Sequence, residues 1–398
     1  GVSALCGSLA SVAANAGTME VLGGATATWS SNEGTNTGNP IGMNTALTFK
    51  GSGELDNGTT FTLTVTGADQ MGYTSGNISM VTPSMGTFVI SSRTGGTGLG
   101  AYDDKMPTAW EESWGHGMTS GFDFQKGVSS AMNVIWTSPS FMGTTLIAAT
   151  APKGNKAAFS NDKSVGGANT RLQGGYDAVL EMKPSFGMDA LSGLTVWVGG
   201  SETEVEGKVS TKNEGDHQEV NAGFTFAYGP VTVGLQKMGE FTGSQTAGNT
   251  DYYDNEAFGI SFNVNDNLSI SYGEFESKRH KKGSGTSDKS VTGTTESFQI
   301  AYTMVGMSLK LAESEVTNAS YSTGGSNAIF VIAPKSHNPV EALLIGTIAS
   351  IEMSRVVTPE VLICCKSGPC GLPRIVSDAN TSFGSLNVKE IVSVNAPV

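Results

Sequence analysis

Four carboxylates gathered in a short stretch of the chain are the residues whose types and spacing suit chemistry best. They are Asp103, Asp104, Glu111 and Glu112, and a single cation, Lys105, stands between them. Neighbouring carboxylates can split their pKa values and divide acid and base roles, as in a paired-carboxylate catalyst. In a wide, water-filled passage the same charges would instead set a preference for one sign of ion. The residues around them must decide between these two uses.

The rest of the sequence offers little to a catalytic or metal site. The four histidines are His116, His217, His280 and His337. None stands beside a serine, aspartate or cysteine pattern typical of a nucleophile system. Cys364, Cys365 and Cys370 lack the histidine or second cysteine pair that a zinc site needs. There is no phosphate loop or nucleotide fingerprint, and no acidic loop has a calcium-binding motif. We therefore expect no catalytic residue, no metal and no cofactor.

The carboxylates belong to a long segment, residues 93–128, which interrupts a series of short alternating segments. It contains five aromatic residues: Tyr102, Trp110, Trp114, Phe122 and Phe124. This content is too high for a disordered linker, and loops of this length in compact proteins are usually functional or disordered. Aromatic side chains let a loop pack on a wall, while carboxylates need water on their other side. The segment suits a loop folded into a wet barrel lumen, and an ordinary surface Ω-loop is the alternative.

Composition narrows the class of protein. Gly makes up 53 of the 398 residues, hydrophobic residues 38% and charged residues 15%. No run of about 18 apolar residues occurs after the first few positions, which excludes a spanning helix. The net charge of -13 argues against a nucleic-acid partner, for which a basic face is expected.

From residue 17 onward the chain reads as a succession of strands. Phe61, Leu63 and Val65 alternate with threonines, a period of two that is typical of a strand with two different faces. Tight turns rich in Gly, Pro, Asn and Asp alternate with long polar loops, such as residues 152–171 and 277–294. This alternation places the tight turns at one end of the sheet and the long loops at the other, as in an outer-membrane barrel. The segments predict an all-β fold, a transmembrane antiparallel β-barrel of about 16 strands with an inward-folded third loop.

Three divisions of the chain are expected. Residues 1–16 read as the remnant of a signal peptide, and Ala14 and Ala16 fit an A-x-A cleavage site. Residues 17–333 would form the barrel. Residues 334–398 lose the polar–apolar alternation, and such a segment would leave backbone groups unpaired in lipid. We expect this tail to lie outside the barrel.

The mature start at Gly17, the alternating strands and the long acidic third loop resemble the general (trimeric, sixteen-stranded) porins of Gram-negative bacteria. In that family the third loop folds into the barrel and turns an acidic side toward basic wall residues. The resemblance implies that Asp103, Asp104, Glu111 and Glu112 form the acidic side of a pore constriction. Lys50, Arg93 and Lys310 each share a strand face with polar neighbours, which makes them the candidates for the basic side.

The expected function is a water-filled outer-membrane channel for passive diffusion of ions and small hydrophilic solutes, weakly cation-preferring. Its expected partners are two further copies of the chain in a homotrimer, outer-membrane lipid and lipopolysaccharide. The basic run at residues 278–282 would lie on a loop rim near that lipopolysaccharide. The alternatives are an outer-membrane barrel enzyme (a phospholipase or protease), which needs a triad or dyad, and a secreted β-solenoid adhesin, which needs a fixed repeat period.

Overall fold

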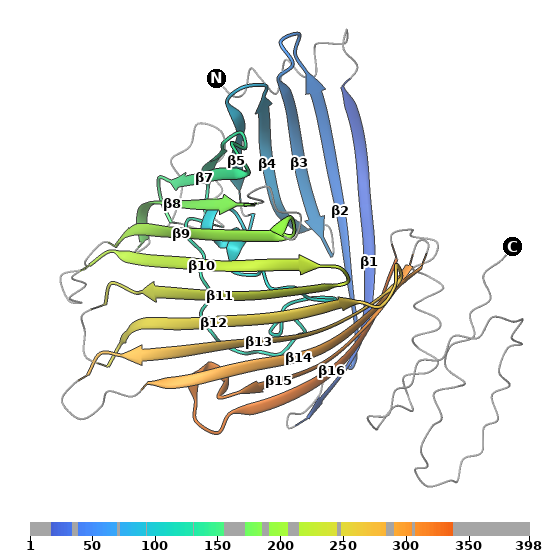
Figure 1. Ribbon diagram of the computed structural model, residues 1–398, viewed down its shortest axis with the longest axis vertical. Coiled ribbons are helices and arrows are strands. Elements are labelled where there is room, and N and C mark those ends of the chain that lie inside the picture. The colour runs from blue at the N-terminus through green and yellow to red at the C-terminus, as the bar shows by residue number, and fades with distance from the viewer. Residues whose placement is uncertain are drawn as a thin grey trace, which may run out of the picture.

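A computed structural model describes residues 17–33, 39–69, 72–92, 94–129, 131–154, 172–184, 191–205, 215–244, 248–283, 290–304 and 307–336. Within these ranges sixteen strands form a closed antiparallel barrel, in which sequence neighbours pair and β1 closes against β16 (Figure 1). The predicted fold class is confirmed. The strands are β1 Thr18–Glu33, β2 Ile41–Glu54, β3 Thr60–Ala68, β4 Gly72–Thr82, β5 Gly86–Ser92, β6 Asn133–Thr137, β7 Thr144–Ala151, β8 Leu172–Met182, β9 Leu194–Val205, β10 His217–Tyr228, β11 Val231–Phe241, β12 Thr250–Asn263, β13 Leu268–Lys281, β14 Val291–Met304, β15 Met307–Thr317 and β16 Ser326–Ser336.

The two faces of the barrel wall have the reverse of the polarity found in a water-soluble protein. Val220 and Phe298 face outward and are 62% and 48% exposed, whereas the inward neighbours Asn221 and Gln299 are 1% and 0% exposed. Side chains alternate between faces along a strand, so each strand presents apolar groups outside and polar groups inside. An apolar exterior around a polar interior suits a wall with lipid on its outer side. No helix among the described residues has the length and apolar character needed to span a membrane.

Several strands extend further toward the long loops than the sequence pattern predicted. The bounds of β8 agree with the prediction, but β13 continues to Lys281 and β14 already begins at Val291. The basic run at residues 278–282, predicted to lie in a loop, therefore stands mostly on β13. The pattern marked only the apolar stretches. Backbone pairing continues beyond them because exposed polar residues can hydrogen-bond across strands just as well.

The last strand also runs past a predicted boundary. β16 ends at Ser336, whereas the barrel was predicted to end at Ala333. The predicted signal-peptide residues, including Ala14 and Ala16, and residues 337–398 of the tail lie outside the described residues. Those predictions stay predictions.

The segment between β5 and β6 lies on the inside of the barrel. It contains a short 3₁₀ helix, η1 (Gly98–Tyr102), which contacts β7, β8 and β9. In Figure 1 the segment passes behind the green and yellow strands rather than extending away from them. We call its described part, residues 94–129, the inner loop. The predicted inward-folded third loop is thereby confirmed.

Candidate pore constriction

A single aspartate on β8 holds both arms of the inner loop. Asp177 Oδ1 accepts a hydrogen bond from the Leu99 backbone N–H (3.0 Å), and Oδ2 accepts one from the Val128 N–H (3.0 Å). All three residues are buried. Hydrogen bonds to an ionised acceptor are stronger than neutral ones. Asp177 therefore clamps the start and the end of the loop at one point of the wall.

A glutamate on β10 holds the returning arm next to that clamp. Glu219 Oε1 accepts from the Lys126 N–H (3.0 Å), and Oε2 accepts from the Gly127 N–H (2.6 Å) and from the Ser201 hydroxyl (2.7 Å). Asn133, the first residue of β6, donates to the Val128 carbonyl (3.1 Å). The backbone of the returning arm is thus satisfied by side chains from the wall, as buried polar groups require.

The middle of the loop is held by polar side chains of β13 and β14. The Gln299 Oε1 accepts from the Trp110 N–H (2.9 Å), and its Nε2 donates to the Glu111 carbonyl. The Ser271 hydroxyl accepts from the Ala109 N–H (2.8 Å). The peptide groups beside the carboxylate pair Glu111 and Glu112 are therefore fixed to the barrel, which places those carboxylates at a defined position.

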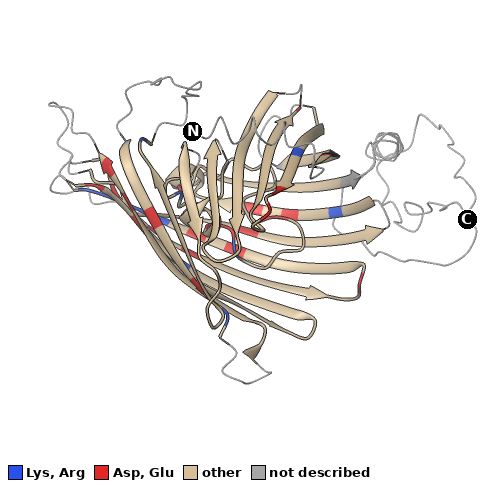
Figure 2. Ribbon diagram, turned by 90° about the horizontal axis from the view of Figure 1, so that it is seen from above, with Lys and Arg blue, Asp and Glu red and all other residues tan. Residues whose placement is uncertain are grey.

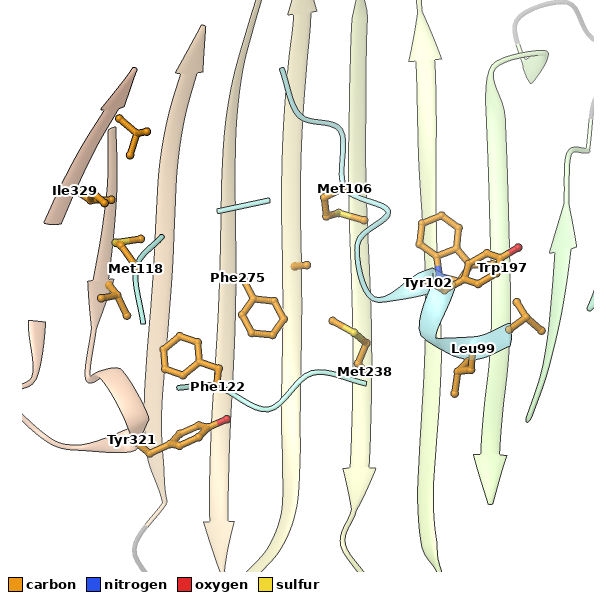
Figure 3. Packing of buried hydrophobic residues seen from close by; sticks show 14 residues of the cluster. Leu99, Tyr102, Met106, Met118, Phe122, Trp197, Met238, Phe275, Tyr321 and Ile329 are labelled. Atoms are coloured by element: carbon orange, nitrogen blue, oxygen red, sulfur yellow. The ribbon is translucent and has the colours of Figure 1, made fainter. Parts of the chain in front are cut away.

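Apolar contacts cover the remaining area between loop and wall. The inner loop packs on the wall in one buried cluster (Figure 3). In it Leu99, Tyr102, Met106, Met118 and Phe122 of the loop face Trp197, Met238, Phe275 and Ile329 of the wall and Tyr321 of the β15–β16 connection. Trp114 adds a ring contact to Phe275, with centroids 4.7 Å apart. Burial of large apolar and aromatic side chains is the dominant favourable term in packing. The inner loop is consequently a fixed part of the barrel core.

Glycines on the wall leave room for this packing. A Cβ at Gly259 would stand 3.0 Å from Met106 and from Pro107, and a Cβ at Gly293 would overlap the Phe122 ring. Contacts under about 3.0–3.4 Å force a neighbour to move. The backbone of β12 and β14 therefore approaches the loop as closely as only glycine permits.

The four loop carboxylates come together as one charged group. Asp104 and Glu111 are exposed, while Asp103 and Glu112 are partly buried. Burial and the neighbouring charge of Asp104 raise the pKa of Asp103 to about 7, and Lys105 opposes this rise. Burial also raises the pKa of Glu112, with contributions from Asp104 and Glu111. Charges that perturb one another in this way share one small region.

Of the three predicted basic residues, the structure describes Lys50 and Lys310, and they stand on different strands. Lys310, on β15, has its Nζ 5.9 Å from the centre of the Trp110 ring. It therefore lies on the part of the wall that the inner loop covers. Lys50, on β2, has its Nζ 3.9 Å from Glu20. Arg93 lies outside the described residues. The structure thus places Lys310 and Lys50 on different parts of the wall.

His116, a residue of the inner loop near Lys310, is buried where the loop packs on the wall. His116 Nδ1 lies 3.0 Å from the Ser314 hydroxyl, and the ring stands edge-on to Trp110. Burial and the charge of Lys310 lower the pKa of His116 to about 4, so its ring is neutral at pH 7.

No motif in the sequence marks the wall residues that hold the loop. Asp177, Glu219 and Gln299 stand on polar strand faces, where they look like any residue that lines a lumen. The hydrogen-bond register that brings each one to the loop depends on the closed barrel.

Comparison with known proteins agrees with this architecture. The model of the Gram-negative porin family matches residues 1–304. OmpF of Salmonella typhi, in complex with daunomycin, is similar in structure with a TM-score of 0.57 at 10% identity, over 80% of this chain and 97% of that one. OmpT, an outer membrane protein of Vibrio cholerae, has a TM-score of 0.54 at 12% identity, over 80% and 97%. No curated protein matches the chain in sequence.

The closed barrel with a loop fixed inside it defines a membrane channel of the porin class. The chain belongs to the Gram-negative porin family. It is an outer-membrane channel protein, located in the bacterial outer membrane. The β-solenoid alternative is wrong, because a solenoid does not close β1 against β16.

Proposed function

We propose that the protein is a passive diffusion channel for ions and small hydrophilic solutes, with a weak preference for cations and no catalytic activity. The observation that supports this best is the orientation of the inner loop. Its backbone and aromatic rings pack on β8–β16, while Asp104 and Glu111 remain exposed inside the barrel. Acidic residues also outnumber basic ones in the sequence, 36 against 23, and Figure 2 shows charged positions of both kinds on the barrel.

The wall formed by β1–β7 offers little positive charge to balance these carboxylates. Within those strands as described, Lys50 is the single basic residue. Its inward face continues across the register through Thr64 and Asn77, which are uncharged, and Glu20 stands directly opposite Lys50. The potential of the loop is therefore not cancelled from this wall. Exposed charges act over about 10 Å at 0.1 M salt, so the cation preference should weaken as salt rises.

The serine–histidine pair under the inner loop lacks the parts of a catalytic triad. His116 and Ser314 are in contact, but His116 Nε2 is buried without a hydrogen-bond partner. In a working triad a carboxylate orients the second ring nitrogen and stabilises the imidazolium. The low pKa of His116 adds to this, because a buried imidazole that resists protonation is a poor general base.

We further propose a homotrimer in contact with lipopolysaccharide. A trimer form is described for one similar structure, OmpT of Vibrio cholerae. The outward face of β14 changes from apolar Phe298 to Glu296, and that of β12 from Phe258 to Glu256. This change marks an edge of the apolar band, because carboxylates are unfavourable next to hydrocarbon. The basic residue Lys278 lies beyond this edge on β13 and suits an anionic headgroup.

Reconstitution into planar bilayers tests the channel proposal. We expect stepwise ohmic conductance, and a reversal potential in a KCl gradient whose sign indicates a modest excess of K⁺ over Cl⁻ permeability. Steps in groups of three, together with a cross-linked trimer band, would support the assembly. Folded protein that gives no conductance, or that prefers anions, would overturn the proposal.

A further inference from the structure

A compact group of three possible metal ligands lies where the returning arm of the inner loop meets the wall. Among the described residues, His217, Glu219 and Glu240 bring one ligand atom each to within 4.8 Å of one another. His217 and Glu219 lie two positions apart on β10 and so share its inward face. Glu240 stands on β11 directly opposite Glu219.

The pairing of the two glutamates calls for a positive charge between them. Like charges directly opposite on neighbouring strands are destabilising. Here the cost is higher, because Glu219 is only 2% and Glu240 only 9% exposed. Buried charges in native proteins are paired or coordinate a metal. The two carboxylates therefore form an arrangement that a bound cation would stabilise.

The hydrogen bonds already present leave one oxygen free for such a cation. Glu240 Oε1 lies 2.9 Å from His217 Nε2, but Glu240 Oε2 is buried and has no hydrogen-bond partner. An unpaired buried carboxylate oxygen costs free energy unless something binds it. Glu219, which already accepts from the loop backbone, can still coordinate, because each carboxylate oxygen has more than one lone pair.

The charged residues around this group also favour a bound cation. Asp123 of the inner loop is ion-paired with Lys126 (2.6 Å), whose backbone N–H donates to Glu219. Three carboxylates, Asp123, Glu219 and Glu240, thus face one lysine. These three carboxylates outnumber the two basic side chains beside them, Lys126 and His217, and a divalent cation would reduce this excess of negative charge.

We propose that His217, Glu219 and Glu240 bind a first-row divalent transition metal, for which Zn²⁺ is the probe. One imidazole nitrogen and two carboxylate oxygens suit Zn²⁺. Ca²⁺ fits poorly, because it takes 6–8 oxygen ligands. Zn–N and Zn–O bonds of about 2.0–2.2 Å require the ligand atoms to close in by a small side-chain rotation. Glu219 also accepts the Lys126 and Gly127 N–H groups, so the metal would stiffen the returning arm of the loop.

The test is calorimetric titration of the folded, chelator-treated full chain in detergent with ZnCl₂ and, separately, CaCl₂. We expect one Zn²⁺ per chain, no Ca²⁺ binding at the same concentrations, and at a hundredfold excess over Kd a rise in Tm of about 4 °C or more. H217Q and E240Q should weaken Zn²⁺ binding at least tenfold. H280Q is the matched control, because His280 stacks on Tyr252 away from this site, and it should bind as the unmodified chain does.

Absent binding, or equal affinity in H217Q and the unmodified chain, would overturn the proposal. If H217Q and E240Q do not fold, X-ray absorption at the Zn edge of the unmodified chain decides. One imidazole with carboxylate oxygens supports the site, and any shell without imidazole contradicts it. Because none of these readouts uses conductance, failure of the channel proposal would be seen separately in bilayers.

Discussion

The barrel wall has a covered half, β8–β15, on which the inner loop packs, and a bare half around β2–β4. Both share one strand pattern, but their inward residues differ in exposure. On β8–β15 many inward polar residues are almost completely buried, for example Asn255 at 2% and Ser277 at 0% exposed, because the inner loop covers them. On β2 the inward Lys50 side chain stays 45% exposed. Alternation alone therefore builds a wall. Fixed hydrogen-bond partners and glycine gaps turn half of that wall into a binding surface for the loop.

The largest effect should come from removing the clamp on the covered half. Asp177→Ala leaves the Leu99 and Val128 N–H groups buried without an acceptor, so we expect a loss of about 2–5 kcal/mol in the free energy of unfolding. The matched change on the bare half, Asn77→Ala, should cost less than about 0.5 kcal/mol. Urea unfolding followed by tryptophan fluorescence measures both. Equal losses would show that the two halves do not differ as described.

A side chain placed under the loop should have the next largest effect. Gly293→Val drives a methyl group into the Phe122 ring, and overpacking of this kind costs about 1–3 kcal/mol. Gly51→Val is the control, because a Cβ at Gly51 on β2 meets nothing within 4 Å. Thermal unfolding and single-channel noise report on the two variants. A stable, quiet Gly293→Val channel would mean that the loop does not pack against β14.

Selectivity should depend on pH through one loop carboxylate. Burial and Asp104 raise the pKa of Asp103 to about 7, above its usual 3.8. The folded chain therefore binds this proton more tightly than the unfolded chain, and Asp103 contributes stability as pH falls from 8 to 5. Over the same range the loop loses negative charge, so cation preference should decline. Reversal potentials in the unmodified chain and in Asp103→Asn measure this, and an unchanged pH dependence in the variant would exclude Asp103 as its source.

The smallest effect is expected on the bare half. Lys50 and Glu20 form an exposed pair at 3.9 Å, and such pairs contribute about 0–1 kcal/mol. Lys50→Gln should leave stability within about 0.5 kcal/mol and raise the cation preference slightly, because Glu20 loses its counter-charge. Ion permeability ratios in a KCl gradient provide the check. A shift toward anions would contradict the assignment of Lys50 to the lumen.

Much of the fold was predictable from local sequence, whereas the contacts that shape the site were not. The period-two pattern predicted the bounds of β8, and the alternation of tight turns with long loops predicted an outer-membrane barrel. The acidic group at Asp103 and Asp104 was also predicted. The position of Lys310 beneath Trp110 and the clamp at Asp177 were missed, because both depend on which strand the loop crosses. That choice is made by register and packing across the whole barrel.

The proposed channel requires that the carboxylates of the inner loop line the narrow part of the pore. The direct test converts Asp103, Asp104, Glu111 and Glu112 together to their amides and measures the reversal potential in a KCl gradient at low salt. Because the wall side chains that hold the loop backbone, Asp177, Glu219 and Gln299, are unchanged, the barrel should stay folded and conducting. We predict a shift of the reversal potential toward anions that shrinks as salt rises. An unchanged reversal potential in the folded variant would show that the loop carboxylates do not face the permeating ions.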